Sequence, residues 1–339
     1  MKSTISFISL FAVMILLSGP GHAETYYVDQ SHPQAQDSNE GIDPLYPWRT
    51  LEKAAISLLP GDTVIVGEGI YTEPMLGYTP DSGRTAVVKP QNSGTEGNPI
   101  VYKAEEGKKV VLEPGDHSGF YISGKNYITI DGFEIRNGIG GITVASGFGR
   151  MKGIRIVNNY IHHIGSSVAN VGGIRLDEAD DSYVGNNLIH NISNNGAINN
   201  NGMCVLSYKI LNVTFENNEC HTANKGIYHK VPFTNEISGV VIKNNFIHNT
   251  VYALEFNNNE KTGFSHRGTL IKNNILLDNK AFIYDTTYQS TRENVGFEIF
   301  NNTVINSGGF TIRGLSDFKF YNNLIKGSPE RMIQTVYQD

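Results

Sequence analysis

Apolar and polar residues alternate in short segments that recur along most of the chain, each around a pair of asparagines. The residue two before each pair and the residue three after its first asparagine are always apolar, and the residues leading up to each pair alternate with a period of two. A period of two with one apolar face is typical of β-strands, and helical spacing is absent. We therefore predict short strands with one buried side around Asn158-Asn159, Asn186-Asn187, Asn217-Asn218, Asn244-Asn245, Asn273-Asn274, Asn301-Asn302 and Asn322-Asn323.

The spacing of these pairs is that of a solenoid. Successive pairs are 21 to 31 residues apart, and a repeat of this length is one structural unit stacked on the next. Asparagine tolerates the left-handed backbone region, so it suits a sharp corner, where stacked amides can also hydrogen-bond along the stack. The pattern predicts an all-β fold, a right-handed parallel β-helix with asparagines at one corner of each coil.

The region before the first pair has a different pattern. Residues 50–59 have apolar positions on one side of a short helix, which Pro60 and Gly61 end. Such a capping helix would cover the open N-terminal end of the stack, where core side chains and strand edges otherwise face water. Strands are expected next at 63–66, 100–103, 110–112, 120–122 and 127–130.

The chain begins with the features of an export signal. Lys2 is followed by an apolar run from Ile5 to Leu17 and then by small residues up to Ala23. The run is shorter than a membrane-spanning helix, and the small residues fit a cleavage site. We predict a signal peptide over 1–23 and a secreted or periplasmic protein without a later membrane span. The rest is predicted to be a single domain over 24–339, with the cap and first coils at 24–125 and the asparagine-marked coils at 126–339.

The net charge excludes one class of partner, and the two cysteines leave one disulfide open. The formal net charge is −6, so no general nucleic-acid-binding surface is expected. We expect a monomer. Cys204 and Cys220 would meet an oxidising compartment, which leaves a disulfide open. The register gives Cys220 a core position, however, where a free, buried cysteine is the expected state.

A column of histidines accompanies the asparagine pairs. Four imidazoles on adjacent coils could form a metal ladder, but coordination needs convergent ligands and outer hydrogen bonds that the sequence does not supply. Stacked surface rings are therefore the expected arrangement. The residues are His162, His190, His221 and His248, each four after the first asparagine of its pair.

Several runs in the N-terminal region form a recognisable set of motifs. They are Pro47-Trp-Arg-Thr-Leu-Glu-Lys-Ala-Ala, Pro60-Gly-Asp-Thr-Val-Ile-Val, Gly69-Ile-Tyr-Thr-Glu, Ser93-Gly-Thr and Asn98-Pro-Ile-Val-Tyr. These runs resemble the right-handed β-helix polysaccharide lyases, in particular the family 9 pectate lyases and the chondroitinase B and alginate lyase group. With the asparagine-marked coils, the resemblance spans nearly all of 24–339. It implies an enzyme that cleaves a uronate-containing acidic polysaccharide by β-elimination. Polygalacturonase motifs, Asn-Thr-Asp and Gly-His-Gly, are absent.

An acidic loop is the candidate metal site. In β-elimination the uronate carboxylate must be neutralised, by calcium or by Arg and Lys side chains, before a base removes the neighbouring proton. The resemblance implies calcium as the cofactor, although the family's spacing of acids is not reproduced closely. A solvated acidic turn is the alternative. The candidate oxygen ligands are Asp177, Glu178, Asp180 and Asp181, a donor type that calcium prefers.

Lys230 is the candidate base. Aligning Gly173 with Gly226, two coils later, places Lys230 in the column of Asp177. The resembling lyases present their base on a lysine that ends the corresponding strand, so we predict Lys230 as the proton acceptor; an ordinary surface lysine is the alternative. Other predicted roles are Arg175 as an outward-facing catalytic partner, Tyr228 and Arg313 as substrate-binding residues, and His229 as an inward-pointing core residue.

Two other functions stay open from the sequence. Tyr228, Tyr252, Tyr284 and Tyr288 recur along the coils, and sugars stack on exposed aromatic rings, so a non-catalytic carbohydrate-binding protein is the second hypothesis. A glycoside hydrolase or epimerase on the same scaffold is the third, since fold does not determine function.

Overall fold

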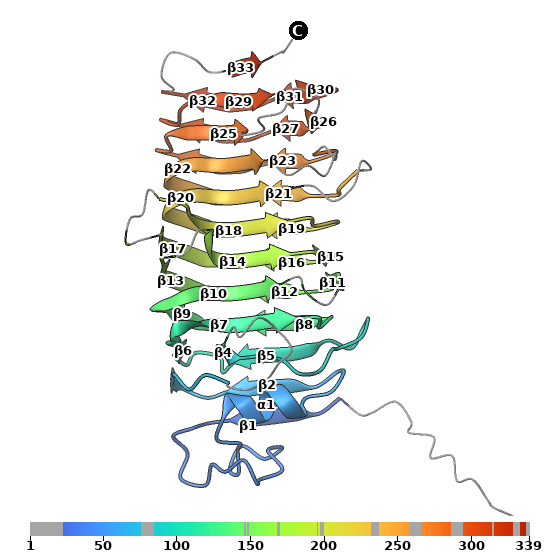
Figure 1. Ribbon diagram of the computed structural model, residues 1–339, viewed down its shortest axis with the longest axis vertical. Coiled ribbons are helices and arrows are strands. Elements are labelled where there is room, and N and C mark those ends of the chain that lie inside the picture. Colours follow the sequence, from blue (N-terminus) through green and yellow to red (C-terminus); the bar gives the residue numbers. More distant parts are fainter. Residues whose placement is uncertain are drawn as a thin grey trace, which may run out of the picture.

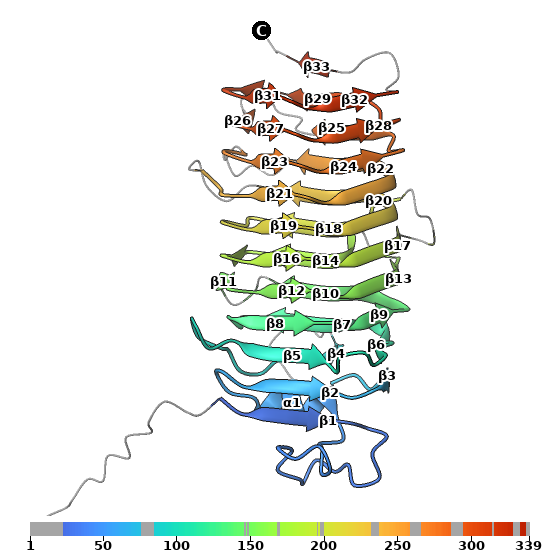
Figure 2. The same ribbon diagram turned by 180° about the vertical axis from the view of Figure 1, so that it is seen from behind.

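The chain folds as a right-handed parallel β-helix, with its coils stacked along the long axis of the molecule (Figure 1 and Figure 2). The fold class predicted from the asparagine spacing is therefore confirmed. The computed structural model describes residues 23–75, 85–145, 147, 149–167, 170–194, 196, 200–231, 237–257, 266–285, 294–313, 315–327 and 333–336. Except for Ala23, the predicted signal peptide lies outside these residues. No helix among them has the length and hydrophobicity of a membrane span.

Wall A of the β-helix is an 11-stranded parallel sheet. Equivalent residues lie side by side on neighbouring coils, as Ile156 does with Ile130 on one side and Val184 on the other. These residues are buried, so columns of apolar side chains hold successive coils together. The strands of wall A are β1 (Thr25–Val28), β2 (Thr63–Val66), β5 (Ile100–Ala104), β8 (Ile128–Asp131), β12 (Arg155–Val157), β16 (Tyr183–Gly185), β19 (Thr214–Glu216), β21 (Val241–Lys243), β23 (Leu270–Lys272), β27 (Glu298–Phe300) and β31 (Lys319–Tyr321).

Walls B and C belong to one 18-stranded sheet that bends around a corner. Two long strands, β20 (Glu219–Lys230) and β22 (Phe246–Asn257), run through both walls. Wall B is completed by β4 (Ala86–Val88), β7 (Gly115–Ser123), β10 (Gly138–Ala145), β14 (Val171–Asp177), β18 (Gly202–Tyr208), β25 (Ala281–Asp285), β29 (Phe310–Arg313) and β33 (Ile333–Val336). Wall C is completed by β3 (Gly69–Tyr71), β6 (Val110–Leu112), β9 (Glu134–Arg136), β13 (Tyr160–Ser166), β17 (Leu188–Asn194), β24 (Ile275–Leu277), β28 (Thr303–Ile305) and β32 (Leu324–Lys326).

The turns between walls B and A contain two further small sheets. One pairs β11 (Met151–Lys152) with β15 (Ala179–Asp180), and the other pairs β26 (Asn294–Val295) with β30 (Leu315–Ser316). The strands predicted in the N-terminal region at 63–66, 100–103, 110–112, 120–122 and 127–130 correspond to β2, β5, β6, β7 and β8.

Asparagines form the corner between walls A and C. The first residue of each pair has a left-handed backbone, as Asn244 does with a φ of 57°. The second residue points inward, and its amide bonds to the next coil: Asn159 Nδ2 donates to Asn187 Oδ1 at 3.0 Å. The same bond repeats on each coil as far as Asn323. Both predicted roles of the asparagine pair, the sharp turn and the amide ladder, are confirmed.

The corner between walls C and B is tight and contains a disulfide. A Cβ at Gly226 would collide with the carbonyl oxygen of Ala253 on the next coil, so glycine suits the point where β20 turns into wall B. One coil earlier, Cys204 lies in register with Gly226 and is disulfide-bonded to Cys220. The expectation of a free Cys220 was wrong. The residue is buried as predicted, but the corner brings the two Cα atoms, 16 residues apart in sequence, to 6.1 Å.

Helix α1 (Leu51–Ser57) covers the N-terminal end of the stack, next to β1 and β2 in Figure 1. Thr50 caps it by accepting a hydrogen bond from the Lys53 N–H at 3.1 Å. Leu51 and Ala54 are buried in the main core, which confirms the predicted capping helix. The helix therefore shields the end of the apolar interior from water.

Candidate functional site

The outer face of wall B carries most of the predicted site residues. Ile174 and Leu176 point into the core, so their neighbours on β14 face outward as expected. The register predicted by aligning Gly173 with Gly226 is confirmed. One column contains Arg175, Leu206 and Tyr228, and the adjacent column contains Asp177, Tyr208 and Lys230.

Two cations on this face share one aromatic ring. The Arg175 guanidinium carbon lies 5.2 Å from the centre of the Tyr208 ring, and Lys230 Nζ lies 5.3 Å from the same centre. Arg175 also binds Asp177: its Nη2 donates to Oδ2 at 2.6 Å and its Nε donates to the same oxygen at 2.9 Å. These contacts hold the two basic side chains on the same side of the wall, one coil from Tyr208 on either side.

The acids of the predicted calcium loop have separate partners. Glu178 lies 3.7 Å from Lys209 Nζ, and Asp181 Oδ1 accepts a hydrogen bond from Asn212 Nδ2 at 3.0 Å. Asp180 Oδ2 accepts from Arg150 Nε at 2.7 Å. Like Asp177, it is therefore already bound by a guanidinium group.

This donor set does not fit a calcium ion held by the loop. Within the described part of the chain, none of the four acids belongs to a group of three metal-ligating side chains that converge on one point. Calcium takes six to eight oxygen ligands, and carboxylates that bind arginine are poorly disposed to supply them. Calcium at this loop therefore stays a prediction without geometric support, and a turn held by ion pairs accounts for the contacts.

Lys225 is a site residue that the sequence reasoning missed. It lies on β20 at the start of wall B, where only 8% of its surface is exposed. Its Nζ donates to Asn224 Oδ1 at 2.8 Å and lies 3.5 Å from Glu255 Oε2, on the next coil. Desolvation lowers the pKa of Lys225, the carboxylate of Glu255 opposes this effect, and the charge of Lys230 adds to it. Alternation counted back from His229 and Ile227 would turn Lys225 inward, and only the corner at Gly226 changes its direction, so the sequence carried no clear signal for this residue.

One tyrosine of this face, Tyr228, is less exposed than predicted. Tyr228 is 4% exposed, and it packs with Met203 and Leu206 in a small apolar cluster outside the main core. Its description as an exposed aromatic was therefore wrong. The Lys225 Nζ lies 5.1 Å from the centre of the Tyr228 ring, so this ring supports the lysine. The role of Tyr228 in substrate binding stays a prediction.

Two other tyrosines form a stacked pair beside the cations. The rings of Tyr252 and Tyr284, on neighbouring coils, have centroids 4.5 Å apart and planes inclined by 16°. Both side chains are partly exposed, as predicted. Tyr288 lies outside the described residues, and Arg313 ends β29 with a side chain that is not among those described.

His229 points into the core, as alternation predicted. Its Nδ1 lies 3.1 Å from Ser207 Oγ, and its ring centroid lies 4.7 Å from that of His266, which is also buried. His266 Nε2 donates to the carbonyl oxygen of Asn257 at 3.2 Å. Burial lowers the pKa of His266 to about 4, and it lowers the pKa of His229 well below its ordinary value.

These two buried histidines predict an acid-sensitive fold. Their folded-state pKa values are depressed, so the unfolded chain binds more protons than the folded chain once the pH falls below about 6.5, and the free energy of unfolding decreases. For His266 this loss is complete near pH 4. Between about pH 6 and pH 4, we expect each pH unit to lower the free energy of unfolding by about 1 kcal/mol per histidine.

Denaturant midpoints measured over a pH series check this prediction. The His266→Gln variant keeps a donor for the Asn257 carbonyl but does not titrate, so its stability should depend less on pH than that of the parent protein. His32→Gln, in the N-terminal loop, serves as the control and should keep the parent slope. Equal slopes in all three proteins would contradict the assignment.

The predicted histidine column is a continuous stack on wall C. The ring centroids of His190 and His221 are 4.5 Å apart, and those of His221 and His248 are 4.7 Å apart. His162 stacks on His190 at 5.3 Å with the planes inclined by 11°. The expectation of stacked rings is confirmed.

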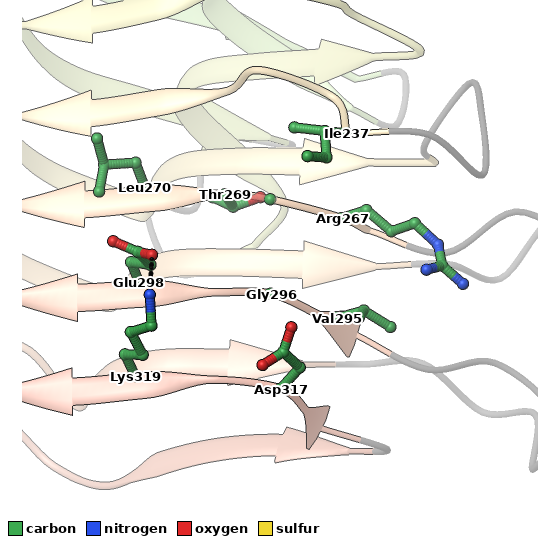
Figure 3. Close-up of a pocket in the computed structure, with 10 residues that line it drawn as sticks. Ile237, Arg267, Thr269, Leu270, Val295, Gly296, Glu298, Asp317 and Lys319 are labelled. Atoms are coloured by element: carbon green, nitrogen blue, oxygen red, sulfur yellow. Dashed lines mark hydrogen bonds and ion pairs between the residues drawn. The ribbon is translucent and has the colours of Figure 1, made fainter.

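A cavity of about 600 Å³ lies away from these residues, on wall A and its turns near the C-terminal end (Figure 3). Glu298 and Lys319 form an ion pair in it, with Lys319 Nζ 2.7 Å from Glu298 Oε1. Arg267 lines another part of the cavity and extends away from this pair (Figure 3). None of the predicted site residues lines this cavity.

Comparison with solved structures agrees with this architecture. A pectate lyase, Pel9A, superimposes with a TM-score of 0.61 at 15% identity, covering 90% of this chain and 79% of its own. The chain has the fold of the β-helix pectate lyases. XylC in complex with xylose gives a TM-score of 0.58 at 15% identity over 87% of this chain and 70% of its own. A family 28 exopolygalacturonase from Yersinia enterocolitica gives 0.54 at 13% identity over 92% and 77%.

The comparisons support the fold that the N-terminal motifs implied. They do not show the activity. No protein-family model matches the sequence, and no curated protein matches it. The names of the three neighbours include a lyase and a polygalacturonase, so one backbone supports different chemistries. The activity of this chain therefore depends on its own side chains and not on the fold alone.

Proposed function

We propose that the protein is a polysaccharide lyase that cleaves a uronate-containing acidic polysaccharide on the outer face of wall B. The observation that carries this proposal is the gathering of three cations on one face: Arg175 lies on one side of the coil that contains Tyr208, and Lys225 and Lys230 lie on the other side. Asp177 and Glu255 lie on the same face, so these five groups together carry one net positive charge, whereas the whole chain carries −6. A polymer that carries a carboxylate on its sugars is the ligand class that such a face attracts.

The proposed chemistry is proton abstraction beside a neutralised carboxylate. A uronate carboxylate placed between the cations would lose much of its charge, which makes the neighbouring C–H more acidic and stabilises the developing negative charge. A lysine then accepts that proton, the carbon-carbon double bond forms and the bond to the 4-linked oxygen breaks. The departing oxygen takes up a proton, from the protonated lysine or from solvent, and leaves as a hydroxyl group. The reaction releases an unsaturated sugar and needs no water.

Lys230 is the proposed proton acceptor because it ends β20 and keeps more of its surface exposed than Lys225 does. Lys225 is held by Asn224, Glu255 and the neighbouring rings, so we assign it the role of a fixed cation that positions Tyr228. Arg175 is proposed to bind the substrate carboxylate from the other side of Tyr208. If the reaction requires calcium, groups other than the acids of the loop would have to bind the ion, because those acids are already paired.

The carboxylates of wall B argue against the hydrolase alternative. Asp177 and Glu255 face outward on coils that are three steps apart, through β18 and β20. At about 4.8 Å per step they are separated by about 14 Å along the stack. Glycoside hydrolases that use two carboxylates hold them about 5 to 9.5 Å apart. These two acids are therefore too distant to act as such a pair.

Incubation with a panel of uronate polymers tests the proposal. Pectate, alginate and glycosaminoglycans are offered to the purified protein with calcium and with a chelator. We expect ultraviolet absorbance from the unsaturated product on at least one polymer. Products whose masses include an added water would show hydrolysis instead. Binding without cleavage on every polymer would support the second hypothesis, a carbohydrate-binding protein that uses the Tyr252 and Tyr284 rings.

A further inference from the structure

Three metal-ligating side chains converge on the outer face of wall C. Glu219 and His221 lie two residues apart on β20, so they project to the same side of the wall. His248 on β22 is the direct partner of His221 on the next coil. The carboxylate and imidazole ligand atoms of these residues all lie within 4.8 Å of one another. His248 Nε2 is 3.2 Å from Glu219 Oε1.

We propose that Glu219, His221 and His248 bind a divalent transition-metal ion of the zinc type. Two imidazole nitrogens and one carboxylate oxygen are a donor set that zinc accepts, with bonds of about 2.0 to 2.2 Å and a fourth position open to water. Two ligand atoms of such a tetrahedral ion lie about 3.3 to 3.5 Å apart. The separation of 3.2 Å between His248 and Glu219 is close to this value, and His221 has to approach by a small rotation of its ring.

The outer ring nitrogens of both histidines already have partners. His221 Nδ1 lies 2.9 Å from the hydroxyl of Thr222, which can accept the Nδ1 proton and leave Nε2 for the metal. His248 Nδ1 lies 2.9 Å from the side-chain amide of Asn249. With the amide oxygen toward the ring, Asn249 would accept the proton in the same way, since the two orientations of an amide are nearly equivalent in shape. Such outer contacts orient metal-binding imidazoles.

The site is open to solvent and lies apart from the proposed catalytic residues. The Glu219 side chain is 45% exposed, so an ion can enter from solvent. The site is on wall C, whereas the proposed catalytic residues are on wall B, so it does not depend on the proposed function.

Calorimetric titration of the chelator-treated, tag-free protein with Zn²⁺ alone, near neutral pH, tests the site. We expect binding of one ion by the parent protein. The affinity for Zn²⁺ should be at least about tenfold weaker in His248→Ala and in Glu219→Gln. The second of these substitutions preserves the shape of the side chain. The matched control is His190→Ala. His190 stacks on His221 at 4.5 Å, as His248 does from the other side, but it does not belong to the ligand group.

A second readout is the thermal unfolding midpoint. Zn²⁺ should raise it for the parent protein and for His190→Ala, and leave it unchanged for Glu219→Gln, because only an ion bound to the folded chain stabilises it. Absence of Zn²⁺ binding by the parent protein would overturn the proposal. Undiminished binding by both His248→Ala and Glu219→Gln would do so as well. Equal loss in His190→Ala would show that the stack, and not this ligand set, holds the ion.

Discussion

Replacement of Lys230 by alanine is expected to lower the rate of elimination about 10²- to 10⁴-fold, the usual contribution of a positioned general base. Lys230 ends β20 beside the Tyr208 ring, in the column of Asp177, so its amine faces the same outer surface as Arg175. Removing it takes away the proposed proton acceptor without opening the core, because the side chain is only partly buried. The rate is measured as absorbance of the unsaturated product on the polymer found active in the panel.

Two further variants show whether the effect belongs to Lys230. Lys243→Ala on wall A removes a partly exposed lysine that pairs with Glu216 at 3.1 Å, and it should keep the parent rate. The double variant Lys225→Met/Glu255→Gln removes the buried ion pair as a unit, so no uncompensated charge is left behind. If this double variant loses the activity while Lys230→Ala keeps it, Lys225 is the base. Full activity in both would refute the proposed site.

Replacement of Asn245 by alanine is expected to lower the free energy of unfolding by about 4 kcal/mol, since each buried polar group left unpaired costs about 1 to 3 kcal/mol. The side chain of Asn245 accepts two hydrogen bonds from Asn218, one from its backbone N–H and one from its Nδ2, both at 3.0 Å. It also donates to the carbonyl oxygen of Phe215 at 3.0 Å and to Asn274 Oδ1 at 3.0 Å. Alanine would remove these partners from groups on the preceding coil and on the following coil at once.

The neighbouring residue supplies the control for this prediction. Asn244 is exposed and has a φ of 57°, so Asn244→Gly preserves the turn and loses only a contact with Glu216 at 3.3 Å. The free energy of unfolding of Asn244→Gly should remain within about 0.5 kcal/mol of the parent value. Chemical denaturation of the three proteins gives the comparison. Similar midpoints for Asn245→Ala and the parent would mean that the amide ladder does not stabilise the stack.

Much of the fold could be predicted because each coil repeats the same local constraints. The inward positions of wall A, such as Ile156 and Val184, follow from a period of two, and the left-handed turn at Asn244 follows from the residue type. The alignment of Gly173 with Gly226 then placed Lys230 in the column of Asp177, which the strand register confirms. A repeat lets one register predict many contacts, since parallel coils stack equivalent residues.

The partners of the polar side chains could not be predicted in the same way. By composition, Asp177 and Asp180 resemble calcium ligands, but each binds a guanidinium group. Asp177 binds Arg175 on its own strand, and Asp180 binds Arg150, which the fold brings from the preceding coil. Lys225 and Glu255 are a pair only because adjacent coils set them side by side. Such contacts depend on where long, flexible side chains end, and spacing along the chain does not determine that.

The sequence by itself determined the coiled architecture, the asparagine corner, the capping helix and the face on which Arg175 and Lys230 lie. These follow from local backbone preference and a strict repeat, which act within one coil and its neighbours. Only the tertiary structure decided that Cys204 and Cys220 are joined, that Tyr228 is buried, and that Glu219 meets two imidazoles on wall C. Those outcomes depend on how sharply each corner bends and how closely successive coils approach, and both are properties of the packed stack.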